Sequence, residues 1–206
     1  MRLAGQKNSA TRGAMAHPPR KTARESSAAG ASGPLVGLPP IAGAEARALV
    51  LGSMPGEVSL AASQYYAHPQ NAFWKVFDAL LGAGPGLDYD DRVAILVRSG
   101  VAVWDVVRSC ERQGSLDSAI VRGSVVVNDF GAFVAAHPQL RLVVCNGATA
   151  RSFFLRYVAP HQGEGVARLR VVQAPSTSPA HASMPLRAKI AAWSEALRDV
   201  VECRAL

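Results

Sequence analysis

The chain has 206 residues, of which 49% are hydrophobic and 18% charged, a composition typical of one globular domain and not of a disordered chain. No stretch reaches the roughly 18 to 20 consecutive apolar residues of a membrane span, and the amino terminus lacks the apolar block of a secretory signal. We therefore expect a soluble, cytoplasmic protein without a membrane partner. The net charge of +7 identifies no partner, because residues 1–33 hold six cations and one acid and leave the rest of the chain only weakly basic.

Residues 1–33 differ in composition from the rest of the chain. They are rich in Ala, Ser, Gly, Arg and Lys and show no apolar periodicity. Such a segment buries too little apolar surface to offset its chain entropy. The sequence therefore predicts a disordered basic tail at residues 1–33 and one folded domain at residues 34–206.

The three cysteines, Cys110, Cys145 and Cys203, lie far apart without a CxxC motif or a nearby pair of histidines. This spacing suggests neither a zinc site nor a disulfide framework, and we expect no metal and no cofactor. Cys145 follows the apolar run that starts at Leu142, so we expect it to be a core residue.

From Ala44 onward, short β-branched runs alternate with helical patterns, which predicts a parallel sheet covered by helices. The expected strands are residues 48–51, 100–104, 141–145 and 169–173. The fold class is α/β: a three-layer α/β/α domain with a short, mostly parallel, four-stranded sheet. We expect the domain to be a monomer.

Three segments have helical periodicity. One runs through Phe73, Phe77 and Leu80, and a second follows a predicted cap at Asn128 and stops before Pro138. The third is predicted to open at Ser183 and Pro185. Its expected apolar stripe consists of Leu186, Ile190, Trp193, Leu197 and Val200.

Unusual loops follow three of the predicted strands, at residues 52–56, at Asp105 and at residues 174–180. Ligands of parallel sheets bind beyond the carboxyl ends of the strands, so we expect these loops to converge on one cleft. Neither GxGxxG nor GxxxxGK[ST] follows the first strand, which argues against a phosphate-binding loop of either kind and disfavours a nucleotide hydrolase.

The segments LVLGSMPGEVSLAASQYYAHPQNAFWKVF and QAPSTSPAHAS resemble the two active-site regions of the uracil-DNA glycosylase superfamily. Within that superfamily they are most similar to the deoxyinosine (hypoxanthine) DNA glycosylases. With GVAVWDVVRSCERQGSLDSAI between them, the resemblance covers about residues 45–200. It implies a glycosylase fold and double-stranded DNA containing deaminated bases as the partner, with single-stranded DNA as a further substrate.

The resemblance assigns the catalytic role to Asn71. Many superfamily members use a polar residue of the first loop to orient the attacking water, but Met54 stands at that place here. Asn71, whose amide both donates and accepts hydrogen bonds, is the candidate that compensates. The alternative is that Asn71 only caps the helix through Phe73.

Base binding is assigned by the same resemblance to Ser53, Met54, Tyr66 and Asp105. Tyr66 matches the aromatic residue on which the extruded base stacks. Asp105 stands where related enzymes place an Asn that reads the base edge, and it can accept a hydrogen bond from N1–H of hypoxanthine. A core tyrosine and a capping or solvated Asp are the respective alternatives.

DNA contacts are expected in the second motif, where hydroxyls and backbone N–H groups can bind phosphates, although a plain Ser/Pro turn would have the same composition. The candidate residues are Ser176, Thr177, Ser178, Pro179, Ala180 and His181.

The leading hypothesis is a monofunctional DNA glycosylase that removes hypoxanthine in base excision repair. The alternatives are a uracil or thymine mismatch DNA glycosylase and a noncatalytic module that binds damaged DNA. Three cysteines are too few for the four-cysteine iron-sulfur cluster of some superfamily branches.

Overall fold

The structure is a computed structural model that describes Met1 and residues 33–200. Nearly all of the tail predicted at residues 1–33 lies outside the described residues, as do residues 201–206. No helix in the described part of the chain is long and apolar enough to cross a membrane.

A four-stranded parallel sheet forms the centre of the domain. Its strands are β2 (Ala48–Gly52), β3 (Val101–Asp105), β6 (Leu142–Asn146) and β7 (Arg170–Ala174), in the order β3-β2-β6-β7. Every residue of β2 and β3 is buried, which explains why these strands read as continuous apolar runs without alternation. All four predicted strands are confirmed to within one residue, and so is the parallel sheet.

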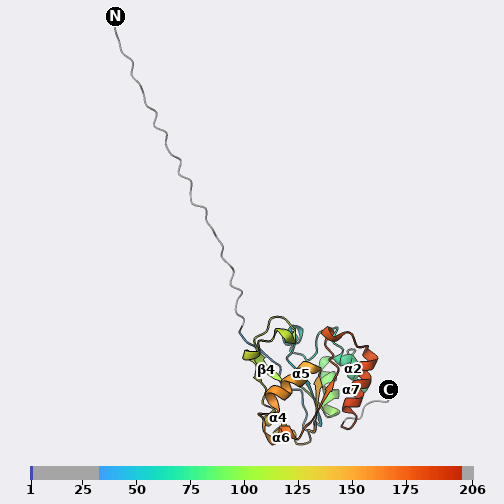
Figure 1. The fold of residues 1–206 in the computed structure, drawn as a ribbon. Coiled ribbons are helices and arrows are strands. Elements are labelled where there is room, and N and C mark those ends of the chain that lie inside the picture. Colours follow the sequence, from blue (N-terminus) through green and yellow to red (C-terminus); the bar gives the residue numbers. More distant parts are fainter. Residues whose placement is uncertain (2–32, 201–206) are drawn as a thin grey trace. The chain divides into compact units, whose positions relative to one another are not determined.

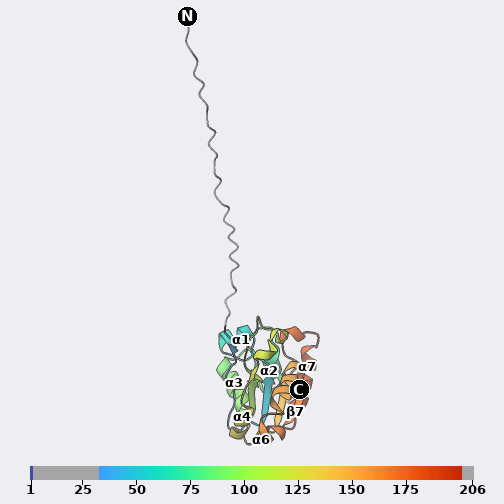
Figure 2. The ribbon, with the colours of Figure 1, turned by 60° about the vertical axis from the view of Figure 1, so that its left-hand side comes forward.

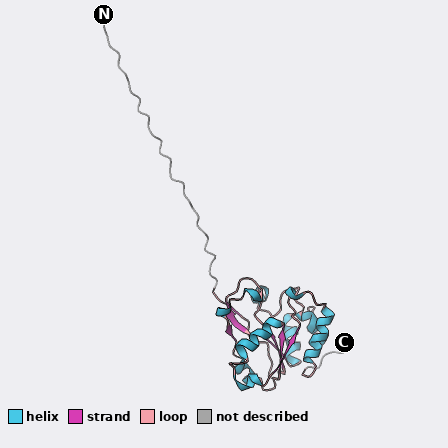
Figure 3. Ribbon diagram, in the orientation of Figure 1, coloured by secondary structure: helices cyan, strands magenta, loops and turns pink. Residues whose placement is uncertain are grey.

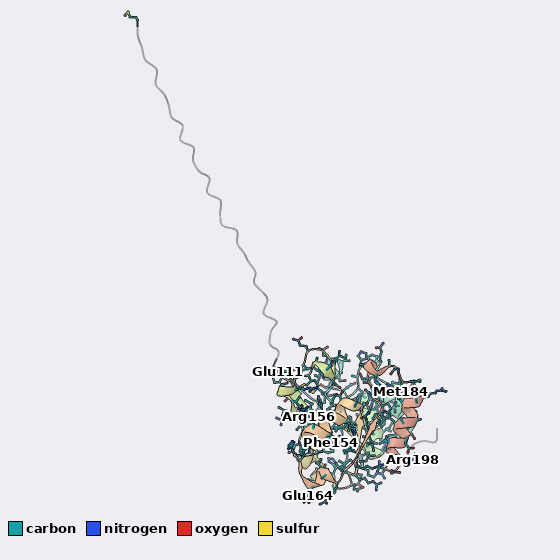
Figure 4. All side chains as sticks on the ribbon, viewed as in Figure 1. Glu111, Phe154, Arg156, Glu164, Met184 and Arg198 are labelled. Atoms are coloured by element: carbon teal, nitrogen blue, oxygen red, sulfur yellow. The ribbon has the colours of Figure 1, made fainter. Side chains whose placement is uncertain are left out.

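Helices cover both faces of this sheet. Helices α2 and α7 pack against each other, while α4, α5 and α6 lie on the opposite side of the sheet (Figures 1 and 2). A π-helical turn at Phe154–Val158 continues α5, and its Phe154 lies within the body of the domain, whereas Glu164 lies at its edge (Figure 4). The helices are α1 (Glu57–Ala62), α2 (Phe73–Leu81), α3 (Tyr89–Arg98), α4 (Phe130–Ala136), α5 (Ala148–Phe153), α6 (Gly163–Ala167) and α7 (Leu186–Leu197).

A small antiparallel sheet, absent from the sequence-based expectations, lies beside the parallel one (Figure 3). It consists of β1 (Leu35–Val36), β4 (Val107–Cys110) and β5 (Val126–Val127), in the order β1-β4-β5. Two of its strands have only two residues each, too few to show any periodicity. The sheet has an apolar cluster of its own that includes Met54.

Two expectations about helix ends were wrong. The cap of α4 is Asp129, whose Oδ1 accepts a hydrogen bond from the Ala132 N–H at 2.9 Å. The side chain of Asn128 is buried and donates to the Asp105 carbonyl at 2.8 Å. Asn128 therefore binds the end of β3 and does not cap the helix. Helix α7 begins at Leu186 with Pro185 at the cap position, so Ser183 lies outside it.

The apolar stripe expected on α7 is confirmed only in part. Trp193 and Leu197 are buried, and Val200 is buried just beyond the end of the helix. Leu186 is 40% exposed, since the first turn of α7 extends past the sheet edge. A buried charged residue, Lys189, occupies a position on α7 that the sequence did not single out.

The cap at Asp129 provides a test of the fold. Substitution Asp129→Ala removes the oxygen that binds the Ala132 N–H, and we expect it to lower the free energy of unfolding by about 1 kcal/mol. Asp129→Asn keeps an acceptor oxygen and should remain within a few tenths of a kcal/mol of the wild type. Urea denaturation of the three proteins measures the difference, and equal losses in both variants would contradict the cap.

Candidate active-site cleft

A cavity of about 740 Å³ opens where the carboxyl ends of the parallel strands meet. Gly52, Asp105 and Asn146, the last residues of β2, β3 and β6, all line it. The three loops that the sequence analysis singled out therefore do converge on one cleft. The remaining lining residues come from segments 53–59, 65–71, 115–118, 147–149 and 173–181.

Strand register brings Gly52 directly opposite Asp105 at the end of the β2–β3 pair. A Cβ atom on residue 52 would lie 2.1 Å from Asp105 Oδ1, far inside van der Waals contact. Only glycine fits beside this carboxyl group. The first motif therefore needs Gly52 because of a side chain contributed by another strand.

Asp105 is almost fully buried, with 4% of its surface exposed, so it is not the solvated turn residue of the alternative interpretation. Its Oδ2 atom has no hydrogen-bond partner among the described residues. Burial and the nearby Asp117 carboxylate raise the pKa of Asp105 to about 8, and Arg112 opposes this shift only in part. Asp105 is therefore a buried, cavity-lining carboxyl group whose surroundings favour its neutral form.

Tyr66 has an unusual backbone conformation for a non-glycine residue, with φ at +55°. Its ring stacks on Phe73 with a centroid distance of 3.8 Å and an interplanar angle of 13°. The phenol oxygen is buried without a partner in the described part of the chain, and it would lie 3.4 Å from a Cβ atom on Gly52. Tyr66 thus places an aromatic face and a polar atom beside Asp105. Tyr65 and Phe73 are core residues.

Asn71 lines the cavity immediately before α2. Its Oδ1 accepts a hydrogen bond from the Phe73 N–H, the first N–H of α2, at 3.0 Å. Asn71 therefore binds the start of the helix from one residue before the cap position, which Ala72 occupies. Its amide nitrogen donates no hydrogen bond within the described residues. The hydrogen bond from the Phe73 N–H uses one lone pair of Oδ1 and leaves the NH₂ group of Asn71 available to the cavity.

The side chain of Met54 belongs to the apolar cluster of the small sheet, where Val107, Cys110 and Ile120 surround it. Only 6% of Met54 is exposed. Its contribution to the cavity is therefore small, and the residue at this loop position anchors the first motif to the small sheet.

Residues 111–120 form a loop that is fastened to the first motif by three hydrogen bonds. Ser53 Oγ donates to Asp117 Oδ1 at 2.7 Å, Arg112 Nη2 donates to the Pro55 carbonyl, and Glu57 N–H donates to Ser115 Oγ at 3.0 Å. The loop supplies Ser115, Leu116, Asp117 and Ser118 to the cavity wall.

The second motif is held at Thr177. Asn146 Oδ1 accepts from the Thr177 N–H at 2.9 Å and Asn146 Nδ2 donates to Thr177 Oγ1 at 2.8 Å. The Thr177 carbonyl accepts from the Ala72 N–H at 2.9 Å, which ties this motif to the start of α2. Thr177 is 1% exposed, and its N–H, its carbonyl and its hydroxyl oxygen all bind protein partners, so it holds the loop from inside.

Buried Lys189 of α7 binds the same motif. Its Nζ donates to the carbonyls of Ser176 and His181 at 2.7 and 2.9 Å. Trp193 Nε1 donates to the Pro175 carbonyl at 3.0 Å. The amphipathic helix α7 therefore sets the position of the loop. Ser176, Ser178 and Pro179 are half-buried along the cavity, and Ala180 and His181 are exposed at its edge.

Sequence reasoning missed Asn146, Asp117 and Lys189. Asn146 could have been found, because it ends an apolar strand as Asp105 does. Asp117 and Lys189 carried no such signal, because their roles depend on contacts that only the fold reveals. Asp117 binds a residue 64 positions away in the sequence, and Lys189 binds one 13 positions away. Within residues 33–200, no group of three or more His, Cys, Asp or Glu side chains could hold a metal ion.

Comparison with known proteins agrees with the sequence resemblance. The profile of the "Uracil DNA glycosylase superfamily" matches residues 39–200. Two proteins named hypoxanthine DNA glycosylase are similar: one from Methanosarcina barkeri, 35% identical over 54% of this chain and 70% of its own, and one from Methanosarcina acetivorans, 32% identical over 57% and 73%.

A solved structure is also similar. The solution NMR structure of a Methanosarcina acetivorans protein assigned to the uracil DNA glycosylases superposes with a TM-score of 0.65 at 26% identity. The match covers 80% of this chain and 97% of the other. The profile match includes the whole parallel sheet and every loop of the cavity, and the chain belongs to the uracil DNA glycosylase superfamily.

Proposed function

We propose that this DNA glycosylase is monofunctional and hydrolyses the N-glycosidic bond of deoxyinosine to release hypoxanthine during base excision repair. The observation that carries the proposal is the combination of two residues of the cleft. Met54 turns its side chain into an apolar cluster, while Asn71 keeps an amide NH₂ group at the cavity. The names of the two Methanosarcina relatives support hypoxanthine as the base.

In the proposed reaction the deaminated nucleotide leaves the DNA stack and its base enters the cavity. One face of the Tyr66 ring packs on Phe73, and the base stacks on the other face. Asn71 orients a water molecule toward C1′ of the deoxyribose. The water oxygen forms the new bond to C1′ as the bond to N9 breaks, the base leaves with the bonding electrons, and the water loses a proton to solvent.

Ser53 and Asp105 complete the proposed base-binding set, with Met54 as its apolar margin. Ser53 takes part through Asp117, to which its hydroxyl is already bound. Asp105 has a free carboxyl oxygen and faces the same cavity. We propose a monomer as the active form.

Double-stranded DNA containing deaminated bases is the proposed substrate, with single-stranded DNA as a further one. We place the DNA backbone along Ser176, Ser178, Pro179, Ala180 and His181, whose loop is held rigidly by Lys189. Thr177 contributes from inside the loop by fixing its shape. A rigid loop binds a phosphate without an additional cost in conformational entropy.

Two alternatives remain open to test. A uracil or thymine mismatch glycosylase is favoured by the assignment of the similar NMR structure. A noncatalytic module that binds damaged DNA would share the fold and the DNA surface but lack the chemical step.

The substrate assignment can be tested with duplexes that carry a single hypoxanthine, uracil or xanthine. We expect hypoxanthine to be released fastest, with full activity in the presence of a chelator, because the proposed step uses only side chains of the cleft. The DNA strand should break only after alkali treatment. Faster release of uracil would favour the mismatch alternative, and tight binding without release of any base would favour the noncatalytic module.

Asn71 can be tested as a catalytic residue and as a cap in one experiment. We expect Asn71→Ala to lower the single-turnover rate by about 10² to 10³, since a preorganised hydrogen bond to the reacting water is lost. Asn71→Ser keeps a capping oxygen for the Phe73 N–H but is too short to reach the water, so it should be stable and equally slow.

The control for lost stability is Asp129→Ala, which removes the cap of α4 at a residue that does not line the cavity. It should melt at a temperature similar to that of Asn71→Ala and retain the wild-type rate. If the serine variant excises hypoxanthine at close to the wild-type rate, Asn71 acts only as a cap.

A further inference from the structure

The carboxyl group of Asp105 lies at the end of β3, lines the cavity and is buried on its protein side. Gly52 leaves room for Oδ1, and Oδ2 has no hydrogen-bond donor among residues 33–200. A buried carboxylate oxygen without a donor is energetically costly, whereas a carboxylic acid needs a partner that both donates and accepts.

The titratable groups that act electrostatically on Asp105 come from two segments. Asp117 and Arg112 belong to the loop of residues 111–120, and Tyr65 and Tyr66 precede α2. Asp105 and Asp117 therefore have only the Arg112 guanidinium group as a shared positive neighbour, and its Nη2 already binds the Pro55 carbonyl. Because the two carboxyl groups repel each other when both are charged, ionisation of one disfavours ionisation of the other.

Hydrogen bonding decides which of the two carboxyl groups is ionised. Burial raises the pKa of Asp117 as well, but Asp117 accepts a hydrogen bond from the Ser53 hydroxyl at 2.7 Å, which offsets part of this rise. Asp105 receives no such bond at Oδ2 and lies deeper in the protein. The proton therefore belongs on Asp105, in agreement with the upward shift of its pKa to about 8.

We propose that Asp105 binds hypoxanthine as a neutral carboxylic acid, whose buried Oδ2 is brought to the cavity by rotation about the Cβ–Cγ bond, so that one oxygen accepts a hydrogen bond from N1–H and the other donates its proton to O6. This inference rests on the proposed function and gives it a protonation state. The N1–H and O6 groups are adjacent on the base, so the two hydrogen bonds form a closed pair. A carboxylate would accept from N1–H but would repel the O6 lone pairs.

A neutral carboxyl group presents the same donor and acceptor as an Asn side chain. Asp105→Asn is therefore the matched variant, because it keeps both hydrogen bonds and cannot ionise. Asp105→Ala removes both and serves as the negative control.

Single-turnover rates at sub-saturating enzyme, which report the pKa values of the free enzyme, should be measured for the three proteins from about pH 6 to about pH 9.5. The expected ratio of wild-type to Asp105→Asn rates is constant at low pH and falls about tenfold per pH unit once the pH exceeds the Asp105 pKa of about 8. Ionisation of hypoxanthine itself acts on both proteins and cancels in the ratio. The alanine variant should be slower by at least about tenfold throughout.

A ratio that rises through pH 8 would overturn the inference, because the carboxylate would then be the binding form. Parallel profiles for the two proteins would overturn it as well. Failure of the wild type to release hypoxanthine at any pH is a different outcome, which contradicts the proposed function.

The protonation state can be tested without DNA, through the melting temperature. Unfolded Asp105 loses its proton at an ordinary pKa of 3.8, whereas the folded protein keeps the proton until about pH 8. Between these values the unfolded state binds fewer protons, so wild-type stability falls as the pH rises, and that of Asp105→Asn lacks this contribution. We expect the melting temperature of the variant, relative to the wild type, to rise steadily over this interval, and a constant difference would show that Asp105 is ionised.

Discussion

The pairing of Gly52 with Asp105 at the end of the β2–β3 ladder is the constraint on which the cleft depends. Parallel strands in register place the last residue of one beside the last residue of the next. A carboxyl group can enter the cavity at Asp105 only because its neighbour has no side chain. The phenol oxygen of Tyr66 reaches the same place from a different segment. The position of the carboxyl group in the cleft is thus determined by the register of two strands and not by a local sequence motif.

The two motifs of the cleft are joined to each other and to the rest of the domain by a few buried polar contacts. Thr177 connects the second motif to β6 through Asn146 and to α2 through the Ala72 N–H. Lys189 and Trp193 connect it to α7. Buried hydrogen bonds of this kind are costly to leave unpaired, so they specify one loop position strongly. A rigid loop is what a glycosylase needs in order to hold a distorted strand of DNA.

Much of this fold was predictable from the sequence because its strands are short, mostly continuous apolar runs that alternate with helical patterns. All four were found, and the loops after three of them were correctly expected to converge. The small sheet was not found, because strands of two residues have no period. The cap of α4 was misplaced by one residue, since Asn128 and Asp129 are equally suitable caps and only the buried contact of Asn128 with Asp105 separates them.

Several residues that line the cleft were predictable from the sequence, but their protonation states and hydrogen-bond partners were not. The sequence identified Asp105 and Tyr66 as candidates, but burial and missing partners, which determine their protonation and polarity, arise only from packing. The same holds for Lys189. From sequence alone, a lysine on an amphipathic helix is expected to be solvated, and its burial becomes apparent only from its contact with the second motif.

The burial of Met54 has a consequence for which side chains the first loop can carry. A polar residue at this position would have to enter an apolar cluster that also includes Val107, Cys110 and Ile120. An unpaired amide there would cost about 1 to 3 kcal/mol, a large fraction of the stability of a domain of this size. A polar version of this loop would therefore require a compensating change in the small sheet.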